Sequence, residues 1–187
     1  MQPSRRQSRW TNALVASAAA LAGVVLSPLT SSVLNAPVVA AEAVAVVDAA
    51  PALDALTAEQ QLLELTNVDR EQHGLPPLTF DPPTLSVARE RAASQLSAPS
   101  LTHYDGSGQL AFVQLLETAG VDYLLAGENL ARSSGLDSGV TQRVEDALMG
   151  SPTHRKNILE PSFTRASIGA ATDEQGRISF AEIFRAE

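Results

Sequence analysis

The sequence contains no cysteine, and this absence removes several classes of protein at once. Without thiols there is no disulfide framework, no thiolate zinc site, no cysteine nucleophile and no lipid-modified cysteine. Basic residues are also few, because 13 Lys and Arg face 21 Asp and Glu. Such an acidic chain lacks the concentrated positive charge that binds phosphate backbones, which argues against a nucleic-acid partner.

Long hydrophobic runs are scarce as well, and the most prominent one lies near the N-terminus. Arg5, Arg6 and Arg9 precede an uncharged apolar run over positions 13–26. This run is shorter than the roughly 20 residues that a membrane-spanning helix needs. We therefore expect residues 1–43 to be a secretory signal peptide, with small-residue cleavage sites around position 36 and positions 40–43. The alternative is an uncleaved signal anchor, which would be the chain's only contact with a membrane.

The rest of the chain divides into a short linker and one domain. Residues 44–56 are rich in Ala and Val without a clear period, which is typical of a flexible linker. Residues 57–187 suffice for one domain with its own hydrophobic core, which has to hold without covalent cross-links. Removal of residues 1–43 would take away three arginines and one glutamate, so an even more acidic domain would reach the cell envelope or the extracellular or periplasmic space.

The hydrophobic pattern predicts helices first and strands last. Thr57 and Gln60 form a capping box for a first helix, and Asp81 with Pro82 begins a second. Further helices are expected at about 109–119 and 137–149, with a helical turn after 151–152. After residue 161 the helical spacing of apolar residues ends, and segments 168–172 and 177–185 are short extended runs that predict a β-hairpin. Residues 78–80 and 123–125 are weaker strand candidates. This order indicates an α+β fold with helices packed on a small antiparallel sheet.

Three histidines are present, and two of them are candidates for a site. His73 lies at a helix C-terminus, where a cation complements the helix dipole, so we interpret it as structural. His103 lies in a polar segment, His154 follows a Ser-Pro helix start, and Glu128 lies between them within Gly-Glu-Asn. Two imidazoles and a carboxylate from three loops are the ingredients of a divalent-metal site. The alternative is that each side chain only forms structural hydrogen bonds.

An ordered set of motifs resembles the CAP superfamily, which comprises cysteine-rich secretory, antigen 5 and pathogenesis-related proteins. The resemblance spans about residues 62–184, and the lack of cysteine makes the chain similar to the bacterial SCP-domain branch. The motifs are residues 67–70 and 74–78, 88–93, His103, 127–131, 151–159, Phe163 and 168–169.

The resemblance implies a three-layer α-β-α sandwich whose central cleft carries two histidines and two acidic residues. In the family this tetrad can hold Zn²⁺ or another divalent cation, and no other cofactor is expected. His103, Glu128 and His154 carry over to three of the four positions. The fourth acidic position falls at Ser151, and the family's usual tryptophan is Leu148 here. A serine cannot supply the missing negative charge, which weakens the metal prediction.

Glu182 is a speculative replacement for the missing acid. With a period of two, Ile178, Phe180, Glu182 and Phe184 share one face of the last strand. A carboxylate in an apolar row is costly to bury unless it is paired or ligating. We hypothesise that Glu182 approaches the two histidines; the alternative is that this face opens to water.

Three functions remain open from the sequence. The first is a non-enzymatic binding module for a lipid, a cell-wall or envelope component, or a protein partner. The second is a metal-dependent hydrolase in the same cleft, and the third is a purely structural envelope domain. A Ser151–His154–Glu128 triad is disfavoured, because a serine before proline at a helix start is ordinarily an N-cap. No catalytic residue can be named.

Overall fold

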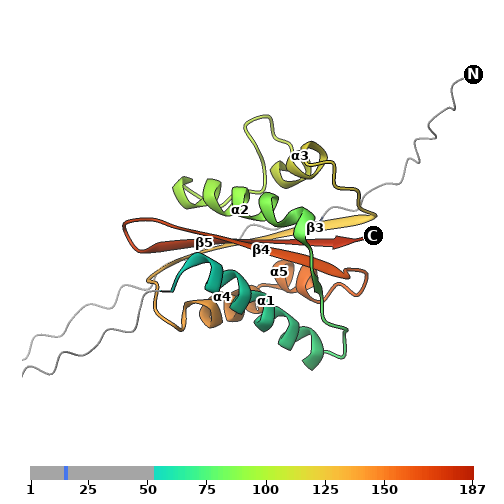
Figure 1. The fold of residues 1–187 in the computed structure, drawn as a ribbon, viewed down its shortest axis with the longest axis horizontal. Helices are drawn as coiled ribbons and strands as arrows, with labels where there is room; N and C mark the ends of the chain where they lie inside the picture. The colour runs from blue at the N-terminus through green and yellow to red at the C-terminus, as the bar shows by residue number, and fades with distance from the viewer. Residues whose placement is uncertain (1–14, 17–52) are drawn as a thin grey trace, which may run out of the picture.

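The structure, a computed structural model, describes residues 15–16 and 53–187 (Figure 1). The predicted signal peptide and nearly all of the predicted linker lie outside the described residues, apart from the short strand β1 (Val15–Ala16). Among the residues that are described, none of the helices combines the length and the apolar character needed to cross a membrane.

A mixed sheet forms the middle of the molecule. Its strand order is β1-β3-β5-β4-β2, with β2 at Thr79–Phe80, β3 at Leu125–Ser134, β4 at Arg165–Thr172 and β5 at Arg177–Ala186. The three long strands are antiparallel, as expected from the hairpin, whereas the two short outer strands run parallel to their neighbours. β5 lies in the middle of the sheet, and helices cover both of its faces.

Helices cover the two faces of the sheet unequally (Figure 1). On one face lie α2 (Pro82–Ser97) and α3 (Ala111–Thr118). On the other lie α1 (Ala55–Gln72), α4 (Val140–Gly150) and α5 (Pro152–Ile158). This arrangement confirms the expected α+β class and the three-layer α-β-α sandwich.

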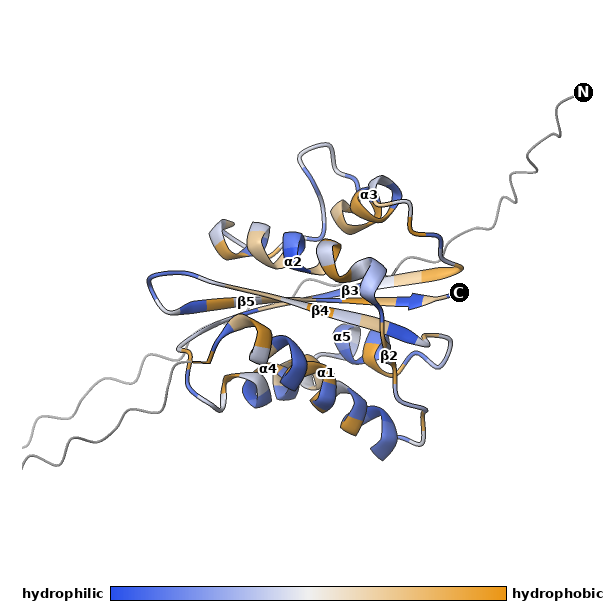
Figure 2. Cartoon of the chain, viewed as in Figure 1, coloured by the Kyte–Doolittle hydropathy of each residue, from blue (hydrophilic) through white to orange (hydrophobic). Residues whose placement is uncertain are grey.

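Side chains along β5 alternate between two parts of the hydrophobic core, one on each face of the sheet. Ile178, Phe180 and Phe184 belong to the apolar cluster under α1 and α4, whereas Ile183 packs with Val87 and Phe112 on the α2 side. Hydrophilic residues occupy much of the outer surface of α1 and α4 (Figure 2). The predicted division of β5 into two faces is therefore confirmed, and Glu182 is buried instead of facing water.

A fully buried arginine on α1 holds neighbouring loops together on the α1 side of the sheet. The guanidinium of Arg70 donates hydrogen bonds to the backbone carbonyls of Pro76, Ile158, Glu160 and Phe163, at 2.7–3.1 Å. These carbonyls belong to the last residue of α5 and to the segments that follow α1 and α5. One side chain thus satisfies carbonyl groups that would otherwise be buried without a donor.

Glycine is required where α2 meets β4. A Cβ placed on Gly169 would lie 2.2 Å from the carbonyl carbon of Ala88. No side chain fits this gap, so the absence of one lets the helix backbone lie directly on the strand.

Several local expectations need correction. The first helix begins at Ala55 inside the predicted linker, and its N-cap is Asp54, whose carboxylate accepts from the Thr57 backbone N–H at 2.9 Å. The carboxylate of Asp54 is a stronger acceptor for this cap than the predicted Thr57 hydroxyl. Ser151 does precede α5, but its hydroxyl is 3.2 Å from that of Thr153 and does not cap the helix.

The strand β3 was the largest element that the sequence pattern did not predict. Its Ala, Gly, Asn and Ser residues have low strand propensity, and the sequence pattern indicates a strand only at residues 123–125. Ten cross-strand pairs with β5 and burial of its central residues hold it in place. Glu128 consequently lies on a strand, and His154 lies on helix α5, not in loops.

Candidate functional site

A buried ion-pair cluster lies between β3 and α2. The Oε1 atom of Glu128 accepts from Nε of Arg91 at 2.7 Å, and its Oε2 atom lies 2.6 Å from Nδ1 of His103 and 3.3 Å from a terminal guanidinium nitrogen of Arg91. All three side chains are buried. The structure therefore brings His103 and Glu128 into direct contact, and adds an arginine that was not among the candidates.

Arg91 is fixed by its position on α2. It follows Ala88 by three residues and precedes Ala92, so it projects from the helix face that packs on the sheet. Its guanidinium also donates to the carbonyl of Thr102 at 2.7 Å, which fastens the segment that carries His103. A charged residue within the apolar stripe of a helix requires a buried partner. This was the sequence signal that could have revealed Arg91.

The backbone of His154 is bound to strand β3 through a network of amide side chains. Asn129 donates to the backbone carbonyl of His154 at 3.2 Å. Asn157 donates to the backbone carbonyl of Glu128 at 3.2 Å and to the side-chain oxygen of Asn129 at 2.9 Å. These bonds fasten α5, and with it His154, to the middle of β3.

Glu182 points to the other face of the sheet from Glu128. In the register of β3 and β5, Glu128 is opposite Ile183 and Asn129 is opposite Glu182. Residues directly opposite each other share a face, and neighbours along a strand alternate. Because Ile183 packs against α2, Glu128 faces α2, whereas Asn129 and Glu182 face α1, α4 and α5. Asn129 donates to Glu182 at 2.8 Å, and this amide lies between Glu182 and the backbone of His154.

A second acidic residue accompanies Glu182. Glu145 of α4 is fully buried, and the hydroxyl oxygen of Thr66 lies 3.2 Å from Oε2 of Glu145 and 3.0 Å from Oε1 of Glu182. A threonine hydroxyl has one proton to donate. Both contacts are satisfied when one carboxyl group is protonated and donates to the threonine oxygen. The cluster of Glu145, Thr66 and Glu182 is thus arranged to share a proton.

The electrostatics assign this proton to Glu145. Burial raises the pKa of Glu145 far above its usual range, and the negative charges of Glu182 and Asp69 raise it further. Burial also raises the pKa of Glu182, but the hydrogen bonds from Asn129 and Thr66 oppose the rise by favouring its charged form. Among the described residues, Oε1 of Glu145 has no hydrogen-bond partner.

A small cavity adjoins the cluster of Arg91, Glu128 and His103. It has a volume of about 270 Å³, and its lining includes Arg91 and Ser94 of α2 and Gln114 of α3. The acidic residues Glu90 and Asp105 also border it. Arg91 is therefore shared between the buried cluster and a hollow that a ligand could reach.

The side chains around Glu128 are not a suitable set of ligands for a divalent cation. Both oxygens of Glu128 already accept hydrogen bonds, and the guanidinium of Arg91 supplies the positive charge that a metal ion would bring. In the chain as described, at 15–16 and 53–187, no three His, Asp or Glu residues gather in a way that could hold a metal. Metal binding by His103, Glu128, His154 or Glu182 stays a prediction from the sequence.

The three-layer α-β-α sandwich is the fold that the sequence motifs imply. The family model described as "CAP: Cysteine-rich secretory protein family" matches residues 63–184. The chain belongs to this family.

Relatives with similar sequence are bacterial. The chain is 32% identical over 111 residues to YkwD of Bacillus subtilis strain 168, an uncharacterized protein, with 59% of this chain and 41% of YkwD covered. It is 33% identical over 114 residues to YlbC, an uncharacterized membrane protein of the same strain, with 60% of this chain and 31% of YlbC covered. The chain thus spans less than half the length of these two relatives.

Solved structures agree on the fold. An extracellular SCP-domain protein of Bacillus anthracis superposes with a TM-score of 0.57 at 28% identity, covering 71% of this chain and 41% of that one. An outer surface protein of Borrelia burgdorferi gives a TM-score of 0.60 at 18% identity, covering 73% of this chain and 98% of that one. The second likeness supports the fold alone.

Proposed function

We propose that this chain is an exported, non-enzymatic binding module whose ligand is a lipid, a cell-envelope component or a protein at the cell surface. The observation that carries the proposal is the charge balance of the site. The guanidinium of Arg91 compensates the carboxylate of Glu128 and also lines a hollow of about 270 Å³. The charge of the buried carboxylate is thus balanced without a metal.

The surroundings of the site also favour binding over hydrolysis. The hydroxyl of Ser151 lies against that of Thr153, and this contact does not activate a nucleophile. The similarity to a protein described as extracellular supports export, together with the basic and apolar N-terminus of this chain. A metal-dependent hydrolase in the same cleft is the alternative, and a structural envelope domain is the other.

Co-sedimentation of the full chain tests the proposal. Purified peptidoglycan sacculi and phosphatidylglycerol vesicles are the two probes, and we expect the protein to pellet with one of them. Gln114→Trp should fill the hollow and reduce binding at least fivefold. Glu117→Trp is the matched control, because Glu117 lies on the exposed side of the same helix and does not line the hollow.

Two results would contradict the proposal. Failure to pellet with either probe would exclude a lipid and a cell-wall ligand. Equal binding by both tryptophan variants would show that the ligand contacts another surface.

A further inference from the structure

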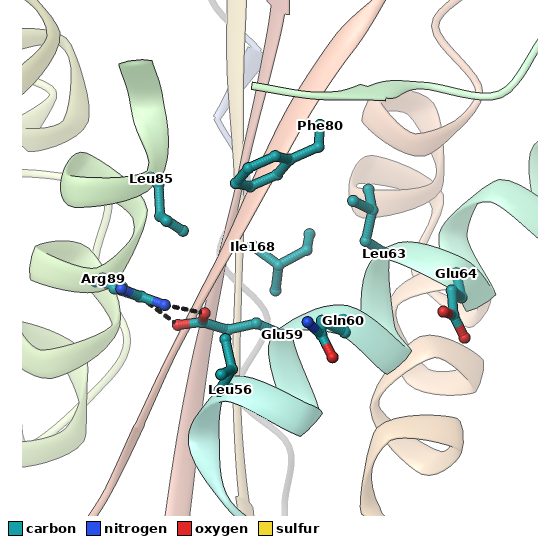
Figure 3. Close-up of a pocket in the computed structure, with 9 residues that line it drawn as sticks. All are labelled: Leu56, Glu59, Gln60, Leu63, Glu64, Phe80, Leu85, Arg89 and Ile168. Atoms are coloured by element: carbon teal, nitrogen blue, oxygen red, sulfur yellow. Dashed lines mark hydrogen bonds and ion pairs between the residues drawn. The ribbon is translucent and has the colours of Figure 1, made fainter. Parts of the chain in front are cut away.

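Two hollows of the described chain differ in how their acidic residues are compensated. In the larger one, a cavity of about 460 Å³ between α1 and α2, the carboxylate of Glu59 lies 2.6 Å from a guanidinium nitrogen of Arg89 (Figure 3). In the hollow of about 270 Å³ between α2 and α3, Glu90 and Asp105 form no ion pair with any residue of the described chain. Both side chains are exposed, so a ligand can reach their carboxylates.

The carboxylate of Asp105 is held in place by its own loop. Its Oδ1 atom accepts from the hydroxyl of Ser107 at 2.7 Å and from the backbone N–H groups of Ser107 and Gln109 at 2.8 and 3.0 Å. These hydrogen bonds, from the Ser107 hydroxyl above all, hold the pKa of Asp105 below its ordinary value, so the group is charged at neutral pH. Within the described residues its Oδ2 atom accepts no hydrogen bond, and it remains available to a ligand.

The buried arginine does not neutralise this hollow. Arg91 is the basic residue among those that line it, and the positive charge of its guanidinium is compensated by the carboxylate of Glu128 at 2.7 Å. The charges of Glu90 and Asp105 are therefore left uncompensated. A ligand of complementary charge, which is a cation, is favoured here.

The opposite wall of the hollow is apolar. Ala111 and Leu115 of α3 line it, and they lie four residues apart, on one face of the helix. Long cationic side chains pack their methylene groups along apolar surface and keep the charged end in a polar environment. The hollow thus has the two surfaces that a primary ammonium group on a short aliphatic chain requires.

The charge of the whole chain separates a cell-wall source of this ammonium from a membrane source. The chain carries 21 acidic and 13 basic residues. Anionic lipid surfaces attract basic segments, so they repel a protein of this charge. Diamino acids of cell-wall peptides present a primary ammonium on an aliphatic chain outside the lipid surface, and they fit both conditions.

We propose that the hollow between α2 and α3 binds the free ammonium of a diamino-acid side chain in a cell-wall peptide, with Glu90 and Asp105 contacting the ammonium and Leu115 packing on the methylene groups. This inference rests on the function proposed above and names the ligand of that site.

Co-sedimentation of the full chain with peptidoglycan sacculi tests the inference when the free amines of the sacculi are acetylated. Acetylation removes the positive charge and should reduce binding at least tenfold. Vesicles of phosphatidylethanolamine and phosphatidylcholine present an ammonium on a lipid, and we expect no pelleting with them. In amide NMR, Nα-acetyl-lysine methylamide should shift the signals of Glu90 and Leu115, and its Nε-acetylated form should not.

Two substitutions form the matched pair. Glu90→Gln removes one charge from the hollow and should weaken binding at least tenfold. Glu117→Gln makes the same change at a residue of α3 that does not line the hollow, and should have less than a twofold effect. Both variants should fold, because the replaced side chains are exposed.

The outcomes separate this inference from the function on which it rests. Undiminished pelleting with acetylated sacculi, or equal binding by the two variants, would overturn the inference and leave the binding module standing. Pelleting with the phosphatidylethanolamine vesicles instead of sacculi would overturn the cell-wall assignment. Absence of pelleting with native sacculi would contradict both the inference and a cell-wall ligand for the module.

Discussion

On the α2 side of the sheet, the buried carboxylate of Glu128 is held between a guanidinium and an imidazole. On the α1 side, the buried carboxylates of Glu182 and Glu145 share a threonine hydroxyl, and neither forms an ion pair within the described residues. Only the thickness of the sheet separates these clusters. The difference shows two ways to bury an acid: a fixed counter-ion on one face, and a retained proton on the other.

The largest effect is expected from removing the counter-ion. Arg91→Leu leaves Glu128 as a buried charge without its guanidinium, and should lower the free energy of unfolding by about 3–5 kcal/mol. Urea unfolding at pH 7 measures the loss. The double variant Arg91→Leu with Glu128→Gln should recover a large part of it, because no unpaired charge then remains.

Arg143→Leu is the control for this comparison. Arg143 pairs with Asp137 at 2.8 Å, but both side chains are exposed. Its replacement should leave the urea midpoint nearly unchanged, since exposed ion pairs contribute little. If Arg91→Leu were as mild as this control, the counter-ion would not be what stabilises Glu128.

On the α1 side we expect a gain in stability that is smaller than the loss caused by Arg91→Leu. The pKa of Glu145 is raised in the folded state, whereas an unfolded glutamate loses its proton near about pH 4.3. Above that pH the folded protein therefore binds more protons than the unfolded chain, so stability falls as pH rises toward the folded-state pKa. Glu145→Gln stays neutral and should stabilise the protein by about 1–3 kcal/mol at pH 8.

The pH dependence is the specific signature of this effect. Thermal melts between pH 4 and pH 9 should show wild type and Glu145→Gln converging near pH 4 and separating above it. Glu64→Gln, an exposed residue on α1, serves as the control and should show no such divergence. Parallel curves for wild type and Glu145→Gln would mean that Glu145 does not retain a proton in the fold.

We expect metal ions to have the smallest effect on the stability of the fold. Saturation of a genuine site at 100 times its dissociation constant would stabilise the fold by about 2.7 kcal/mol. Because Arg91 already compensates Glu128, we expect the melting temperature of the full chain to be the same with Zn²⁺ and with chelator. A zinc-dependent rise that disappears in the His103→Ala and His154→Ala double variant would contradict this expectation and support the hydrolase alternative.

The sequence predicted the parts of this molecule that are locally encoded. The β4–β5 hairpin and the two faces of β5 follow from alternation over a few residues, and both are confirmed. That His103 and Glu128 belong to one site came from the resemblance to a family, since no local pattern brings together residues that are 25 positions apart.

The polar partners could not be predicted because they depend on long-range packing. Arg91 meets Glu128 only after α2 packs on β3, and Glu145 meets Glu182 only after α4 packs on the other face. A charge on an apolar stripe can be recognised, but the identity of its partner requires the register of the sheet.

Arg70 has a consequence for a chain without sulfur cross-links. Its guanidinium joins the segment after α1 to the end of α5 and the segment that follows by hydrogen bonds alone, in the way that a disulfide joins two segments of a cysteine-containing domain. Such a set of hydrogen bonds has no redox potential. The stability of the domain therefore does not depend on thiol–disulfide exchange with its surroundings.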